Sequence, residues 1–162
     1  MNGIPDSVRE MAEFSPLEDV ALAVLRERIP ALRFTTIYEQ VTEFPYVMIR
    51  RDPSFGGWTG DPRFIDSGRI TCHVLVSGPD NDQDAADLGD AIRVALRDAA
   101  NERKTYATGT VLKAKQHSNP ARRSDWASAT GPVQYADLPA GVVRYECSFD
   151  IAVRKPRTTP AP

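Results

Sequence analysis

The chain has 162 residues and a formal net charge of −2, and 41% of its residues are hydrophobic and 26% charged. This length fits one domain that can bury a core without disulfides or a structural metal. The near-neutral charge gives no overall bias toward nucleic acid or acidic membranes as partners.

The first predicted element is an amphipathic helix over residues 16–29. Ser15 can cap it, Pro16 suits the first helical position, and Glu18 and Asp19 lie at the positive end of the helix dipole. Apolar residues then recur at helical spacing until Pro30 ends the run: Leu17, Val20, Ala21, Val24, Leu25 and Ile29. This spacing predicts a helix that buries one face.

Three strands are predicted next. Aromatic and β-branched residues indicate short strands over residues 34–41 and 46–49, joined by a turn, and the Gly- and Pro-rich residues 52–62 indicate a long loop. Side chains alternate over residues 69–76. This places Ile70, Cys72, Val74 and Val76 on one face and Arg69, Thr71, His73 and Leu75 on the other.

A second helix is predicted over residues 83–103, with a buried stripe of Ala85, Leu88, Ile92, Ala95, Leu96 and Ala99. A strand over 110–115 and a polar segment over 116–141 follow. The last predicted strand covers 142–153 and has Val143, Tyr145, Cys147, Phe149, Ile151 and Val153 on one face. The order α-β-β-β-α-β-β predicts a single domain over residues 15–153. An N-terminal extension (1–14) precedes it and a Pro/Thr-rich tail (154–162) follows it.

The sequence shows no set of residues typical of a catalytic, cofactor or metal site. The known nucleophile, phosphate-loop, dinucleotide and zinc-protease motifs are missing, so we expect a protein that is not an enzyme. Cys72 and His73 are adjacent in a strand and should point to opposite faces, which rules out a nucleophile–base pair. Cys72 and Cys147 lie in apolar stretches and are expected to be buried free thiols in a reducing cytosol.

Neither a membrane-spanning helix nor a signal peptide is expected. No apolar run approaches the roughly 20 residues that cross a bilayer. The first residues also lack the basic and apolar regions of a secretory signal. We therefore expect a soluble chain that is made in the cytosol and does not bind membranes.

Two groups of residues are candidates for interfaces. Exposing large apolar side chains of an irregular loop to water costs free energy, which favours their docking on a partner. The residues concerned are Phe55, Trp58, Phe64 and Ile65 in the first long loop and Trp126 and Tyr135 in the second. The basic residues are Lys113, Lys115, Arg122 and Arg123. Basic residues next to an aromatic side chain, here Trp126, can form a nucleic-acid-binding surface. The alternative, which we prefer, is that they form an arm that contacts a neighbouring subunit.

Four segments resemble the tail terminator proteins of long-tailed phages, particularly those of mycobacteriophages and other actinobacterial phages. They are residues 44–49 (FPYVMI), 66–76 (DSGRITCHVLV), 85–96 (AADLGDAIRVAL) and 144–151 (RYECSFDI). The likeness covers residues 17–153 and consists of packing patterns rather than a catalytic signature.

The resemblance implies an α+β fold: a mixed, mainly antiparallel sheet of about five strands, two helices on one face, and long protruding loops. It implies a virion protein, assembled in the bacterial host cytoplasm, whose homohexameric ring caps the tail tube. The ring would meet the tail tube protein and the head–tail connector, and DNA would pass through its lumen without sequence-specific binding. The alternatives to a tail terminator are another phage neck or minor tail protein and a small nucleic-acid-binding module.

Overall fold

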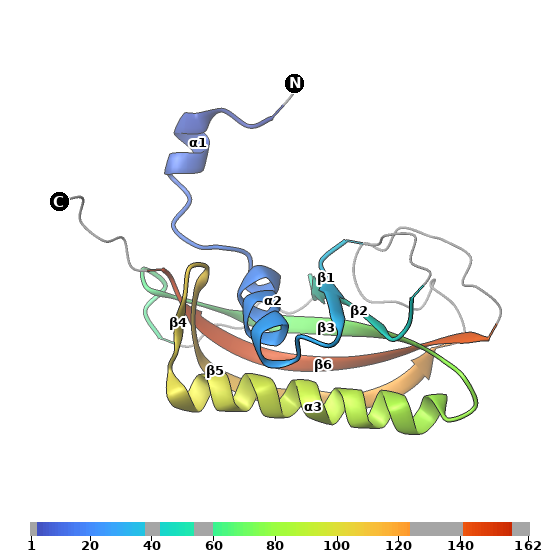
Figure 1. The fold of residues 1–162 in the computed structure, drawn as a ribbon. Coiled ribbons are helices and arrows are strands. Elements are labelled where there is room, and N and C mark those ends of the chain that lie inside the picture. The colour runs from blue at the N-terminus through green and yellow to red at the C-terminus, as the bar shows by residue number, and fades with distance from the viewer. Residues whose placement is uncertain (1–2, 38–42, 54–59, 124–140, 157–162) are drawn as a thin grey trace.

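The computed structural model describes residues 3–37, 43–53, 60–123 and 141–156. They form an α+β domain with a curled, mixed six-stranded sheet and three helices (Figure 1). The helices are α1 (Asp6–Glu10), α2 (Leu17–Arg28) and α3 (Asn81–Glu102). The strands are β1 (Arg33–Thr35), β2 (Tyr46–Arg51), β3 (Ile65–Ser77), β4 (Thr105–Tyr106), β5 (Gly109–Arg123) and β6 (Val142–Arg154).

The sheet has the strand order β1-β2-β3-β6-β5-β4. Strands β1 and β2 pair in parallel, and the other neighbours pair antiparallel. The two 13-residue strands β3 and β6 form its centre, and their register sets Cys72 opposite Cys147 and His73 opposite Glu146. These two pairs, which are 75 and 73 positions apart in the chain, thus become direct neighbours.

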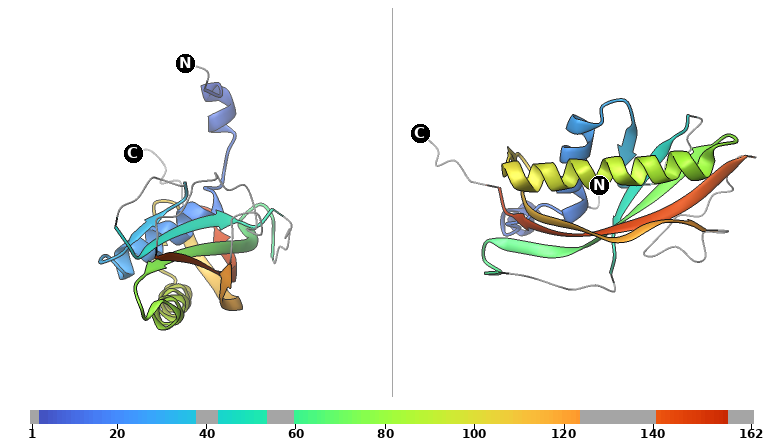
Figure 2. Two further views of the ribbon diagram at one scale, coloured as in Figure 1. Left: turned by 90° about the vertical axis from the view of Figure 1, so that its right-hand side faces the viewer. Right: turned by 90° about the horizontal axis from the view of Figure 1, so that it is seen from below.

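One face of the sheet forms the apolar core, which α2 and α3 cover (Figure 2). The predicted stripes are confirmed: the apolar residues of both helices and the predicted inner faces of β3 and β6 belong to one buried cluster, except for Ile29 and Val143, which are partly buried and pack against it. Helix α3 approaches β5 closely at Gly89, where an added Cβ would lie 2.4 Å from Pro120 Cγ. A larger residue at position 89 would therefore push the helix off the strand.

The structure has six strands rather than about five, because the chain after α3 forms the two-residue strand β4 and turns back into β5. Strand β5 continues to Arg123, eight residues beyond the predicted end at Lys115. Residues 116–123 are mostly exposed and their pairing with β6 contains register shifts, so the apolar alternation that marks a half-buried strand is missing there. Strand β3 likewise begins earlier than predicted, at Ile65.

The predicted turn between the first two strands is wrong, since β1 and β2 run parallel. Side-chain alternation indicates the face to which a residue points, but it carries no information on strand direction. The first strand also ends at Thr35 instead of continuing through residues 36 and 37. Pro16 occupies the N-cap position of α2, one residue later than predicted, and Ser15 makes no capping bond. Helix α1 lies in the predicted extension and was not predicted.

Candidate functional site

A buried charged cluster lies on the sheet face opposite the apolar core. The side chains of His73 and Arg144 are 0% and 1% exposed, and that of Glu146 is 6% exposed. Arg144 Nη1 donates to Glu146 Oε1, which lies 3.5 Å from His73 Nδ1, and Arg123 Nε donates to Glu146 Oε2 at 3.1 Å. The Glu146 carboxylate therefore joins β3, β5 and β6 across the polar face.

The imidazole of His73 is neutral at pH 7. Burial lowers its pKa to about 4, Glu146 opposes this shift, and the guanidinium groups of Arg144 and Arg50 add to it. Arg144 Nη1 lies 3.4 Å from His73 Nδ1. A cationic donor at this position suits an imidazole whose Nδ1 carries no proton.

The free thiols of Cys72 and Cys147 face each other within the apolar core. A hydrogen bond to Cys147 and burial both raise the pKa of Cys72, so its thiol stays protonated. Cys72 points away from the face that carries His73, as the alternation predicted. The pair offers neither an activated nucleophile nor an adjacent base.

Loss of the His73 side chain should change the acid sensitivity of the fold. Because its pKa is lower when folded (about 4) than when unfolded (6.5), the stabilisation is complete above pH 6.5 and is lost as the pH falls toward 4. The loss reaches up to about 3 kcal/mol. Urea unfolding at several pH values should therefore show a weaker pH dependence for His73→Gln than for the wild type. The exposed His117→Gln is the control, and equal slopes for both variants would contradict this account.

A polar cavity of about 230 Å³ lies beside the charged cluster. Its charged residues are engaged within the chain: Arg69 Nε donates to Asp150 at 2.7 Å, and Arg123 to Glu146. The hydroxyls of Ser118 and Ser148 are 2.7 Å apart. The lining consists of Asp52, Arg69, Thr71, His117, Ser118, Arg123, Glu146, Cys147 and Ser148. These contacts stabilise the sheet, and within the described residues no three His, Cys, Asp or Glu side chains are placed to hold a metal ion.

The four basic interface candidates separate into two groups. Lys113 and Lys115 are exposed on β5 opposite Ala152 and Asp150 of β6, and Arg122 is exposed opposite Tyr145. None of these three makes an ion pair with the residues that the structure describes. Arg123 differs because it binds Glu146. The exposed cations therefore follow β5 to its end, and Arg123 belongs to the buried cluster.

The apolar loop candidates are only partly described. Phe64 is 49% exposed, and the cationic groups of Arg63 and Lys155 are 5.4 and 5.3 Å from the centroid of its ring. Ile65 is half-buried at the start of β3, so it belongs to the sheet and not to the loop. Phe55, Trp58, Trp126 and Tyr135 lie outside the described residues.

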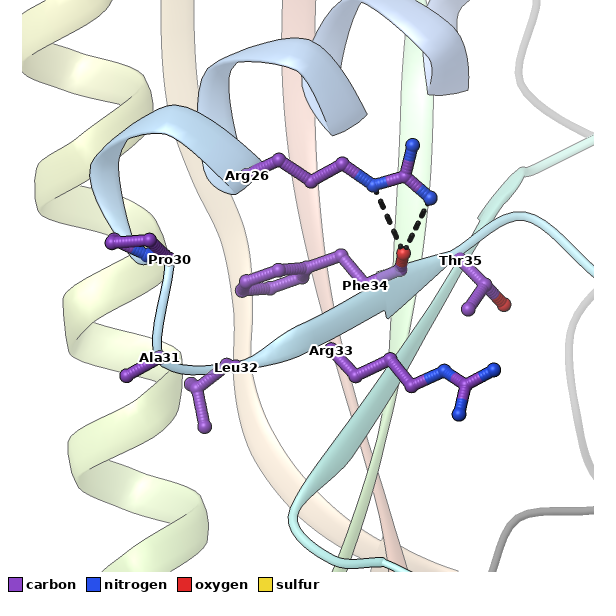
Figure 3. A pocket seen from close by; sticks show the side chains of 7 residues that line it. All are labelled: Arg26, Pro30, Ala31, Leu32, Arg33, Phe34 and Thr35. Atoms are coloured by element: carbon purple, nitrogen blue, oxygen red, sulfur yellow. Dashed lines mark hydrogen bonds between the residues drawn. The ribbon is translucent and has the colours of Figure 1, made fainter.

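Two further surfaces were not predicted from the sequence. The first is an N-terminal arm, which we define as residues 3–13 and which is exposed throughout. Its large apolar side chains Ile4, Val8 and Met11 are 56%, 49% and 80% exposed. The second is a groove of about 400 Å³ between the end of α2 and β1 (Figure 3). In the groove, Arg26 donates two hydrogen bonds to the Phe34 carbonyl, at 3.0 and 3.3 Å. The four- and three-residue spacing of the arm's apolar side chains is the signal that could have identified it.

Comparison of the chain with protein-family models gives no match, and comparison with curated proteins gives none either. Among the described residues, none of the helices combines the length and apolar character needed to cross a bilayer.

Proposed function

We propose that this chain is a structural subunit of a phage tail, a tail terminator whose copies form a ring on the tail tube and join it to the head–tail connector. The sequence resemblance supports the choice of family. The observation that carries the proposal is the open, cationic edge of β5, because an edge of this kind is a template for contact with another chain.

The outer edge of β5 lacks a paired strand over most of its length within the described residues. Strand β4 pairs only with Gly109 and Thr110, and within the described residues no strand pairs with that side of β5 from Val111 to Arg123. Register shifts interrupt this strand at three places, which opposes simple continuation of the sheet into a neighbour. The exposed lysines therefore favour a partner surface that carries acidic side chains.

Acidic side chains for such a contact are available on α3. Asp61, Asp66 and Glu146 are not free for such a contact, because they form ion pairs within the chain with Arg63, Arg51 and Arg144 respectively. Asp84 and Asp87 are instead exposed on α3, beside an apolar groove that includes Leu88. A contact between β5 of one copy and α3 of the next joins two different surfaces, which is the arrangement that closes into rings.

The double change Lys113→Glu, Lys115→Glu should weaken the assembly. The reversed charges would repel the acidic surface of the neighbour, most strongly at low salt, where the screening length is greatest. Sedimentation at low and high salt should therefore show smaller particles at low salt and partial recovery at high salt. Arg97→Glu with Arg103→Glu makes the same change in net charge and serves as the control. An intact assembly of unchanged size would show that the lysines do not form this contact and would favour their lining the DNA passage.

Another neck or minor tail protein would assemble through the same kinds of surface. A small nucleic-acid-binding module is the second candidate, since the exposed cations Lys113 and Lys115 lie on one face of β5, although Arg122 is exposed on the other face of the strand. Such a surface would bind phosphates without reading sequence. DNA binding that weakens steeply with salt, by a protein that stays monomeric, would favour the module over the ring subunit.

A further inference from the structure

The N-terminal arm makes almost no contact with the rest of its own chain. Residues 3–13 are all exposed, and α1 has no buried residue. The arm's ion pair with the body is at its base, where Glu13 Oε2 lies 3.1 Å from Lys155 Nζ. Figure 1 shows α1 standing away from the sheet and from the other two helices.

Such a helix needs a surface that the single chain does not provide. Isolated helices shorter than roughly 12–15 residues are marginal in water, and α1 has five residues. Its exposed apolar residues are Val8 within the helix and Met11 at its C-cap, three positions apart and on one side of the helix, together with Ile4 in the extended residues before it. This is the anchor pattern of a short helix that binds in a groove.

Charge selects the groove at the end of α2 as the binding surface. The arm carries Asp6 and Glu10 against a single cation, Arg9, besides Glu13 at its base. The charged residues of the α2–β1 groove are both positive, Arg26 and Arg33, and the rest of its lining is Pro30, Ala31, Leu32, Phe34 and Thr35 (Figure 3). The groove at Leu88 is lined instead by Asp84 and Asp87, which would repel the arm.

We propose that the arm of one copy docks in the α2–β1 groove of a second copy. The arm leaves the body at the start of α2, and the groove lies at the other end of this 12-residue helix, roughly 18 Å away. Lys155 fixes the base of the arm beside the end of β6, so docking in the chain's own groove requires the arm to double back along α2. Arm-in-groove contacts are head-to-tail and can close a ring. The inference rests on the proposed self-assembly and names one of its contacts.

Crosslinking of the double variant Val8→Cys, Ala31→Cys tests this contact. Both positions are exposed, one on the arm and one in the groove, whereas Cys72 and Cys147 are fully buried and should not react. With a short bismaleimide, docking between copies predicts a ladder of covalent dimers and higher multiples in a denaturing gel. Crosslinks within single chains would show that the arm binds its own groove and would overturn the proposal, as would the absence of crosslinks.

Two further variants measure the contact without crosslinking. Val8→Asp should weaken association about tenfold, because a buried apolar side chain is replaced by a charge. Ser7→Asp, exposed but off the apolar side, should leave association unchanged. Arg33→Glu should also weaken it, and Glu10→Arg in the same chain should restore it. If the wild type assembles and Val8→Asp assembles equally well, the arm contact is wrong but the proposed ring is unaffected. A wild type that stays monomeric would overturn both the arm contact and the ring.

Discussion

Replacing Glu146 with alanine is expected to lower the free energy of unfolding by about 3–5 kcal/mol. The carboxylate is 6% exposed and binds Arg144, which is 1% exposed, and Arg123, and it lies 3.5 Å from His73. Removal of one partner from a buried ion pair is costly because the other charge keeps its desolvation penalty and loses its counter-charge. Urea unfolding of the purified variant measures this effect.

Glu102→Ala is the matched control for this change. Glu102 also pairs with an arginine, Arg28, at 2.6 Å, but its side chain is 56% exposed. An exposed ion pair contributes at most about 1 kcal/mol, so this variant should unfold near the wild-type urea concentration. Equal losses for the two variants would show that burial does not set the strength of the Glu146 cluster.

The second large effect is expected for Leu96→Ala, which should cost about 2–5 kcal/mol of stability. Leu96 is fully buried in the cluster that joins α3 to the sheet, so its truncation removes apolar contacts and leaves a cavity. Arg97→Ala, at the exposed neighbouring position, should change stability by less than about 0.5 kcal/mol. A loss at Leu96 no larger than that at Arg97 would contradict the packing of α3 against the sheet.

The elements with strong periodicity could be predicted from the sequence, and their packing follows from it. The stripe on α3 and the alternation in β3 and β6 indicate which side chains enter the core, and the structure confirms these faces. Polar strands lack this signal. Strand β5 beyond Lys115 is held by main-chain pairing with β6 and is exposed, so its composition resembles that of a loop.

The charged cluster could not be recognised in the sequence because its members are distant in the chain. Arg144 and Glu146 stand two positions apart in a strand, as many exposed residues do, and His73 joins them only through the pairing of β3 with β6. The same limit applies to Arg123, which appeared to be one of four equivalent basic residues until its contact with Glu146 separated it from Lys113 and Lys115. Sequence spacing identifies the face of a strand but not its neighbour.

The mass of the protein in solution tests the central proposal, assembly into a ring, most directly. Light scattering coupled to size exclusion should give a discrete particle of about 107 kDa, six times the 17.9 kDa of one chain, if the ring has the six subunits implied by the resemblance. The particle should keep this mass over a wide range of protein concentrations, because a closed ring leaves no free surface for further addition. A mass of 17.9 kDa at every concentration would contradict the account.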